Sequence, residues 1–438
     1  MEPIKYKILG SWFGMALGEA MGLSVRGLKP ETVSQCFKQM DGFKDVRPFI
    51  GKGVKRFSLQ GLYGAQTQLA LSACEVLLIN RKMVREDFSG YLIRLTSEGP
   101  EPYPGVLRHP QGRFRRILNA FPDLPLGILP GKNFSDCSFI SLAVPVALYH
   151  PKDPAAMRKQ VLEAFLAVDR NLNEAAAIVM TGYCIQKFLD LQETEDGLDV
   201  DGKNLVLEVT EFCEQTETFF KEEYGQLWED NAIEFPLSYS FRRLIECWNL
   251  SFEEFKMRIC EQASPWLPSP VNHISQGLAL TLIPLALRLV LKEEKKFSSL
   301  LTRALNMGRA ADSLGTLVGA LAGALYGFSS IPDAWRTGLM NAKEIKIRGE
   351  ALFSRRYPKG AKDLVEMESG LTQKEYESGK KYIPKIPVKA AKKPRAFFDP
   401  WEDDPEEPDF PPREDAAARR KFLKDKTRKK RNRRRNIP

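Results

Sequence analysis

GSWFGMALGEAMG at residues 10–22 and GTLVGALAGALYG at residues 315–327 are the two stretches that decide the fold. Each places glycine at every fourth position, and this spacing puts the glycines of each stretch on one stripe of a helix. Glycine inside a helix costs about 1 kcal/mol relative to alanine, so four of them are a large penalty unless a backbone packs against the stripe. We therefore predict that each stripe seats another helix at short distance.

A membrane helix is the alternative explanation for a glycine stripe. The uncharged run at residues 314–328 is shorter than the ~20 residues that a span needs. The first stripe contains Glu19 and is followed by Arg26, and the longest apolar segment, at 274–291, contains Arg288. These features favour buried helices of a soluble protein and predict no transmembrane segment.

The remainder of the body also has apolar residues at helical spacing, separated by turns that contain glycine and proline. The predicted helices cover residues 8–22, 66–80, 134–149, 154 to about 191, 204–224, 238–249, 251–263, 274–291, 297–306 and 313–327. We expect the helix at 134–149 to break near Pro145, and residues 23–58 to form a loop. Strand signals are scarce, so the predicted fold class is all-α, as one compact helical domain.

The character of the chain changes after about residue 345. We expect a helical domain over 1–345, a short helical or irregular extension over 346–378, and a disordered, charged C-terminal tail over 379–438. The tail begins acidic and rich in proline and ends strongly basic, a composition that resists packing.

The net charge of the 438-residue chain is +9, and it is concentrated at the C-terminus. Residues 419–438 carry twelve Lys and Arg and one acid, so their +11 leaves −2 for the rest of the chain. The body is therefore not a basic nucleic-acid binder. The segment between Arg419 and Arg435 predicts binding to a polyanion such as RNA, the ribosome or an anionic membrane surface. The alternative is an unstructured solubility tail that touches the acidic stretch at 399–415.

Cysteine usage points to a reducing compartment. The seven cysteines are dispersed and form no CxxC pair, which is typical of reduced, mostly buried thiols. The first ten residues lack the basic start and apolar core of a signal peptide. We expect a cytoplasmic protein.

Three segments together resemble the ADP-ribosylglycohydrolase family, whose members include dinitrogenase-reductase-activating glycohydrolases and ADP-ribosylarginine hydrolases. GSWFGMALGEAMGLSVRG (10–27) resembles the family's N-terminal signature, and YGAQTQLALSACEVLL (63–78) resembles its W-T-D-D-T-Q segment. RAADSLGTLVGALAGALYGFSSIPDAW (309–335) resembles its C-terminal D-x-D-T signature. The resemblance implies an all-helical hydrolase fold, an ADP-ribosyl substrate and, in active members, two Mg²⁺ ions in a central cleft.

This sequence departs from the family at the metal ligands. Gly64, Ala65 and Gln66 stand at the T-D-D positions, and Ala310 stands at the first Asp of D-x-D-T, so that only Asp312 is kept. Two Mg²⁺ ions bring four positive charges and need several oxygen ligands each. We therefore expect a pseudoenzyme with its magnesium site lost and no resident cofactor. A single Mg²⁺ held weakly by Asp312 and Ser313, the latter at the family's Thr, is the remaining metal alternative.

The candidate catalytic residues are Glu19 and Asp312. Glu19 stands at the internal Asp of the first signature, and Arg26 stands at the acid that ends it. An arginine stays cationic and repels metal ions; pairing of the two acids with Arg26 or Arg309 would replace metal charge with side-chain charge. The non-catalytic interpretations are a helix cap for Asp312, a buried paired acid or a polar wall of the cleft for Glu19, and a solvated or paired loop residue for Arg26.

The resemblance places a phosphate-contacting loop near residues 131–142, without the family's Met-Arg pair. The candidate ligand-binding residues are Gln66, Thr67, Ser135, Ser138, Arg26 and Ser313, for a nucleotide-like, ADP-ribose-like or phosphate-bearing ligand. Serines are also common in any loop that enters a helix. Two alternatives remain open: a working ADP-ribosyl hydrolase that is metal-free or has a reduced metal set, with Glu19 or Asp312 as general base, and a structural protein that uses only its surface.

Overall fold

The computed structural model describes residues 3–120, 136–191, 193–194, 197–198, 201–225, 237–266 and 270–382. The described part is helical apart from turns and one antiparallel pair of two-residue strands, β1 (Glu193–Thr194) and β2 (Gly197–Leu198). The all-α fold class is therefore confirmed. The expected disordered tail lies, from residue 383 onward, outside the described residues.

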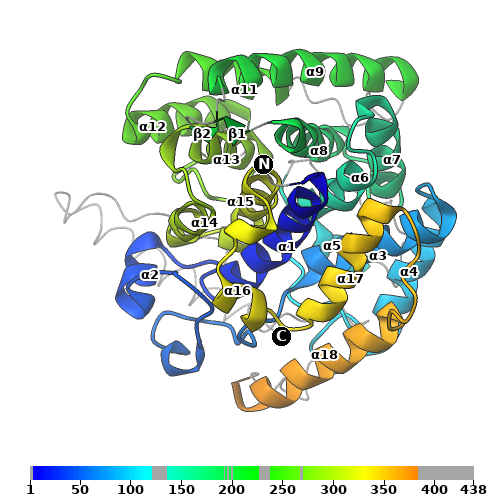
Figure 1. Ribbon diagram of the computed structural model, residues 1–438. Coiled ribbons are helices and arrows are strands. Elements are labelled where there is room, and N and C mark those ends of the chain that lie inside the picture. Colours follow the sequence, from blue (N-terminus) through cyan, green and yellow to red (C-terminus); the bar gives the residue numbers. More distant parts are fainter. Residues whose placement is uncertain are drawn as a thin grey trace, which may run out of the picture. The chain divides into compact units, whose positions relative to one another are not determined.

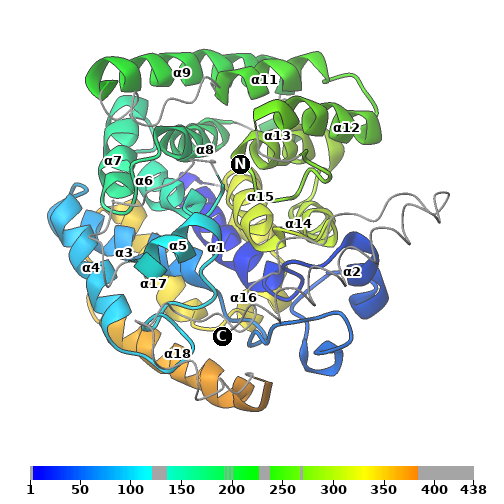
Figure 2. The same cartoon turned by 180° about the vertical axis from the view of Figure 1, so that it is seen from behind.

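Helices α1 (Ile4–Gly22) and α15 (Ala311–Tyr326) lie side by side in the interior (Figures 1 and 2). They are antiparallel, because Gly10 faces Gly323 while Gly18 faces Gly315. A Cβ added at Gly18 would lie 1.8 Å from the carbonyl oxygen of Gly315, far inside van der Waals contact. The two glycine stripes therefore seat one another, which confirms the predicted close helix contact.

Other helices enclose this pair. Those that contact α1 or α15 directly include α3 (Ala65–Asn80), α6 (Ala143–Tyr149), α8 (Leu172–Asp190), α13 (Ala279–Arg288), α14 (Phe297–Asn306), α16 (Asp333–Gly338) and α17 (Ala342–Ser354). The remaining helices are α2 (Pro30–Phe37), α4 (Arg85–Ser97), α5 (Gly112–Ala120), α7 (Pro154–Leu166), α9 (Gly202–Glu223), α11 (Leu237–Glu246), α12 (Phe252–Ala263) and α18 (Leu364–Gly379). Short 3-10 or π segments are η1 (Arg47–Phe49), η2 (Ile140–Leu142), η3 (Ser264–Trp266), η4 (Leu289–Glu293), η5 (Phe328–Ser330) and η6 (Lys380–Tyr382).

Several helix starts follow from local sequence. Asp153 accepts a hydrogen bond from the backbone N–H of Ala156 at 2.9 Å, with Pro154 at the first helical position of α7. Ser251 and Glu254 form a reciprocal capping box at the start of α12. Such caps satisfy backbone N–H groups that have no partner within the helix.

The structure differs from the sequence-based expectation at several places, among them α4 and α5, which the sequence did not predict. The helix predicted over 134–149 begins only with η2 and α6, and Pro145 does not break it, because Pro145 falls in the first turn of α6, where its missing N–H costs nothing. Residues 23–58 include α2 and η1. The helix predicted over 274–291 starts at Ala279, because the backbone before it pairs with Cys137 and Ala310 instead.

Two helices occupy the expected extension. α17 runs across residue 345, and α18 follows it and packs against α3 and α4. Among the described residues, none of the helices combines the length and the apolar character that crossing a membrane requires.

Candidate functional site

The C-terminal end of α1 meets the N-terminus of α3 through Glu19, which is 1% exposed. Its Oε1 accepts from the backbone N–H of Gln66 at 3.0 Å, and its Oε2 accepts from that of Thr67 at 2.8 Å. The N-cap residue of α3 is Gly64, which has no side chain to cap the helix, and a Cβ there would lie 2.8 Å from Oε1 of Glu19. Glu19 thus caps α3 from another helix, a favourable place for a carboxylate.

Burial raises the pKa of Glu19 above its usual value, against the opposing effect of hydrogen bonds from Thr67 and Gln66. The nearby carboxylate of Asp312 raises this pKa further. Glu19 is thus a buried acid whose partners are backbone N–H groups of α3.

Asp312 lies in the first turn of α15 and is 1% exposed. Its Oδ2 accepts from Nη1 of Arg26 at 3.2 Å, and the same Nη1 donates to the carbonyl oxygen of His109 at 2.7 Å. The side chains of Arg26 and Asp312 are 8% and 2% exposed. The ion pair between Asp312 and Arg26 is one of the pairings that the sequence leaves open for these two acids.

Gln66 and Ser313 join the starts of α3 and α15. Nε2 of Gln66 donates to Oγ of Ser313 at 2.8 Å, and Nε2 of Gln111 donates to the same oxygen at 2.5 Å. A serine hydroxyl has two lone pairs, so both acceptor positions of Ser313 are used. Ser141 in turn donates to the carbonyl oxygen of Gln66 at 2.7 Å.

Ser138 lies in a neighbouring cluster and not beside Glu19. Its N–H donates to Oδ1 of Asp136 at 2.9 Å, and its hydroxyl donates to the carbonyl oxygen of Gln111 at 3.1 Å. The other oxygen of Asp136 accepts from the N–H of Arg113 at 2.7 Å. Ser135, the other serine expected in this loop, lies outside the described residues.

The same cluster contains two more buried acids. The guanidinium of Arg113 is bound to Asp169 by two hydrogen bonds, from Nε and Nη2. Burial, followed by the charges of Asp136 and Asp169, raises the pKa of Glu174 well above its usual value. Burial also raises the pKa of Asp136. Three carboxyl groups thus gather around one arginine where the resemblance predicts phosphate contacts.

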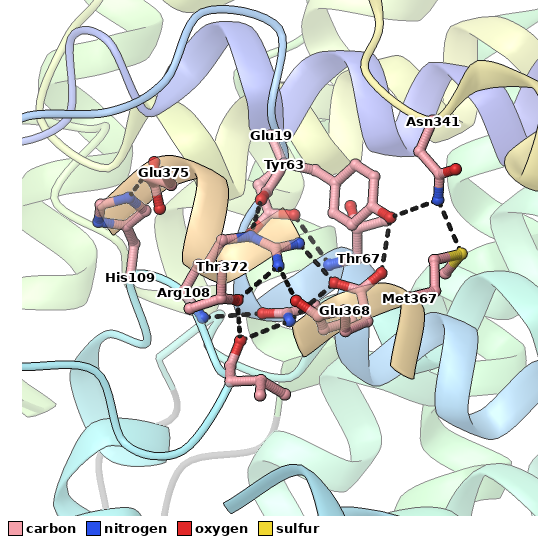
Figure 3. Close-up of polar contacts among 12 residues, drawn as sticks. Glu19, Tyr63, Thr67, Arg108, His109, Asn341, Met367, Glu368, Thr372 and Glu375 are labelled. Atoms are coloured by element: carbon pink, nitrogen blue, oxygen red, sulfur yellow. Dashed lines mark hydrogen bonds and ion pairs between the residues drawn. The ribbon is translucent and has the colours of Figure 1, made fainter. Parts of the chain in front are cut away.

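Sequence reasoning missed a third network, which α18 brings to the site (Figure 3). Glu368 and Arg108 form an ion pair at 2.6 Å with both side chains fully buried. Tyr63 donates its hydroxyl to Glu368 at 2.7 Å, and Nε2 of Gln68 donates to it at 2.9 Å. The sequence offered only a weak signal for this network. Glu368 and Glu375 are seven residues apart and would fall on one face of a helix.

His109 and Glu375 form a second contact between α18 and the segment that follows Arg108. Nε2 of His109 lies 3.0 Å from Oε1 of Glu375, and the same oxygen accepts from the N–H of Leu59 at 2.9 Å. The sequence alone does not single out His109. His109 links its own segment to α18 through Glu375. The sequence predicts only a short helical or irregular extension where α18 lies, so it could not reveal this contact.

Most of the oxygens that could bind the family's Mg²⁺ ions already take part in hydrogen bonds. The oxygens of Glu19 accept two N–H groups, Ser313 accepts two amide N–H groups, and Asp312 accepts from Arg26. Among the described residues of this site, Oδ1 of Asp312 and Oε1 of Gln66 are buried without a hydrogen-bond partner. No group of three or more His, Cys, Asp or Glu suited to a metal ion occurs within the described ranges. A two-Mg²⁺ site needs about six oxygen ligands around each ion.

Comparison with known proteins gives a family and a fold. Among 46 matching chains of solved structures, one described as an ADP-ribosylglycohydrolase-related protein complex aligns with a TM-score of 0.54 and 19% sequence identity. The alignment covers 82% of this chain and 100% of the other, and at this identity it supports the fold alone. A search of curated proteins finds no match. A sequence model of the family described as ADP-ribosylglycohydrolase matches residues 1–362, and the chain therefore belongs to the ADP-ribosylglycohydrolase family.

Proposed function

We propose that this chain keeps the family's fold without two-metal hydrolysis, as a pseudoenzyme that binds a nucleotide-like or ADP-ribose-like ligand or serves as a scaffold. The observation that carries the proposal is the ion pair of Arg26 with Asp312. A guanidinium, which does not lose its proton in proteins, places a permanent positive charge on the one acid kept from the family's D-x-D-T signature.

Glu19 supports the same proposal through its contacts. A carboxylate that accepts two backbone N–H groups at the start of α3 has a structural task. Moving it onto a metal ion would leave the amides of Gln66 and Thr67 buried without a partner, which costs about 1–3 kcal/mol for each group.

The rival function is ADP-ribosyl hydrolysis with a reduced metal set or without metal, in which Glu19 or Asp312 acts as general base. One observation favours it: the pKa of Glu19 is raised by burial, and perturbed acids are common at catalytic sites. The hydrogen bonds that Glu19 and Asp312 already accept weaken both as bases.

The charged residues near the site bear on which class of ligand this chain binds. Arg26 suits a phosphate, but Asp136 and Asp169 already accept from the N–H groups of Arg113, a cation near the loop expected to contact phosphates. This cluster favours the scaffold over tight binding of a pyrophosphate.

Calorimetric titration of the full-length chain with Mg²⁺ and with ADP-ribose tests the proposal. We expect no saturable Mg²⁺ binding, and no ADP-ribose release from a modified peptide with or without Mg²⁺.

A fourfold variant that restores acids, with R26E, A65D, Q66D and A310D, should gain Mg²⁺ affinity, whereas R94E on the exposed face of α4 should not. Mg²⁺-dependent turnover by the unmodified chain would overturn the proposal. Thermal protection by ADP-ribose would identify the binding function, because ligand at 100 times its Kd adds about 2.7 kcal/mol.

The basic segment between Arg419 and Arg435 favours a second function, binding of a polyanion. Several phosphate contacts would make that binding steeply dependent on salt. Deleting residues 416–438 should abolish binding to single-stranded RNA and to anionic vesicles and leave the melting temperature unchanged. Retained binding at the same salt concentration would exclude this segment.

We also propose a cytoplasmic location, which the seven free cysteines support.

A further inference from the structure

The helix α18 lies beyond the region that the family model matches, which ends at residue 362. It nevertheless buries polar side chains against the segments next to Arg26 and the start of α3. Glu368, Thr372 and Glu375 all point from α18 toward Arg108 and His109 (Figure 3). The hydroxyl of Thr372 donates to the carbonyl oxygen of Val106 at 2.6 Å.

Two of the contacts between α18 and this region involve its buried carboxyl groups. Glu368 binds the guanidinium of Arg108, and Glu375 binds the ring of His109. Only the second leads directly to the family's retained acid, because the carbonyl oxygen of His109 accepts from Nη1 of Arg26, and Nη1 also donates to Asp312.

The backbone of His109 is held in an unfavourable conformation. Its φ is 50°, in the left-handed region that residues with a side chain rarely adopt. Such a conformation persists only where surrounding contacts impose it. The ring of His109, fixed by Glu375, supplies one such contact, and the result is a carbonyl oxygen directed at Arg26.

We propose that α18 is a C-terminal strap, and that His109 and Glu375 are the positioning residues through which it holds Arg26 on Asp312. This inference rests on the proposed function, in which Arg26 supplies the positive charge beside Asp312. The alternative is that α18 only stabilises the fold and that Arg26 keeps its place without it.

The strap is tested by the NMR signal of the Arg26 guanidinium in the full-length chain, identified by its loss in Arg26→Lys. The measured quantity is the exchange rate of the guanidinium protons with water. Glu375→Ala should raise this rate by about tenfold or more, as expected when an anchored hydrogen bond to a charged group is lost. Glu375→Gln, which can still accept from His109, should restore most of the protection.

Glu368→Gln is the matched control, because it removes the other buried charge of α18 and leaves the contact between His109 and Glu375 in place. It should change the Arg26 rate by less than about twofold, whatever its effect on melting. His109→Gly gives a second variant for the case in which Glu375→Ala does not fold. Glycine tolerates φ near 50° without strain, so His109→Gly should fold. Because it lacks the ring that Glu375 holds, its backbone is free to leave this conformation and release Arg26.

Two results would contradict the proposed role of α18. One is an unchanged proton exchange rate of Arg26 in both Glu375→Ala and His109→Gly, and the other is an equal rise of this rate in Glu368→Gln and Glu375→Ala. Neither measurement of the Arg26 exchange rate involves Mg²⁺ or ADP-ribose. Failure of the proposed function, seen as Mg²⁺-dependent turnover, is therefore distinguishable from failure of this inference.

Discussion

Gly18 in α1 and Gly315 in α15 meet backbone to backbone, and a Cβ added at Gly18 would lie 1.8 Å from the carbonyl oxygen of Gly315 and 2.2 Å from its carbonyl carbon. No flexible side chain is available to move aside. The closeness of the two helices brings Glu19, one residue further along α1, near Asp312 in the first turn of α15. The glycine stripes thus place the candidate site.

Gly18→Ala should therefore destabilise the chain strongly. The two helices would have to separate along their length, so we expect a loss of more than about 3 kcal/mol, at the upper end of overpacking effects. Gly90→Ala in α4 is the control, because a Cβ there meets nothing within 4 Å. It should stabilise the chain by about 0.5–1 kcal/mol. Denaturant unfolding of both variants measures the difference, and similar values for the two would contradict the close contact.

Glu19→Gln tests the capping role of Glu19. An amide offers one acceptor where the carboxylate offers two, so one N–H of α3, from Gln66 or Thr67, would face an NH₂ group. We expect a loss of about 1–3 kcal/mol. Asp153→Asn at the exposed start of α7 should cost little, because asparagine caps nearly as well as aspartate. Equal unfolding free energies for the two variants would show that Glu19 does not cap α3.

Much of the fold could be predicted because its signals are local. The glycine stripes, the Asp153–Pro154 start of α7 and the helical spacing of α3 are all properties of short segments. The segment before α13 could not be placed, because Cys137 and Ala310 supply its hydrogen-bond partners from distant parts of the chain. Helical periodicity carries no information about such contacts.

The candidate site could be predicted only in part for the same reason. The sequence indicates that Glu19, Asp312 and Arg26 belong together, because the family resemblance aligns them. It does not indicate that Glu19 caps a second helix. Nor does it reveal Glu375 and His109, since their contact depends on α18 folding back onto residues more than 260 positions earlier.

A double-mutant cycle on Arg26→Met and Asp312→Asn measures the strength of the buried ion pair. Arg26→Met alone leaves a buried carboxylate without its cation and should cost about 3–5 kcal/mol. The double variant should recover part of this loss, giving a coupling energy of roughly 1–3 kcal/mol. The exposed pair Arg47–Asp45 provides the control cycle, for which a coupling below about 1 kcal/mol is expected. Additive effects of Arg26→Met and Asp312→Asn would contradict a direct interaction.

The buried acid Glu174 should make the chain less stable as pH rises. Its folded pKa is well above the usual 4.5, first because of burial and then because of Asp136 and Asp169. Between the unfolded and folded pKa values, the unfolded chain has lost this proton while the folded chain keeps it. Unfolding then releases a proton, so the free energy of unfolding falls with pH, by at most about 1.4 kcal/mol per unit for one group.

Glu174→Gln should remove this part of the pH dependence, because glutamine keeps the shape of the protonated acid and does not ionise. The variant should therefore gain stability relative to the natural chain as pH rises above the unfolded pKa, in the range where the folded group alone is protonated. Glu254→Gln is the control: hydrogen bonds from Ser251 lower the pKa of Glu254, so its contribution is already complete above the unfolded pKa and cannot change the slope at neutral pH. Urea unfolding at several pH values gives the slope for each chain. Parallel curves for Glu174→Gln and the natural chain over this range would mean that Glu174 is ionised in the folded protein, and that the acidic cluster beside Arg113 carries more negative charge than its burial allows.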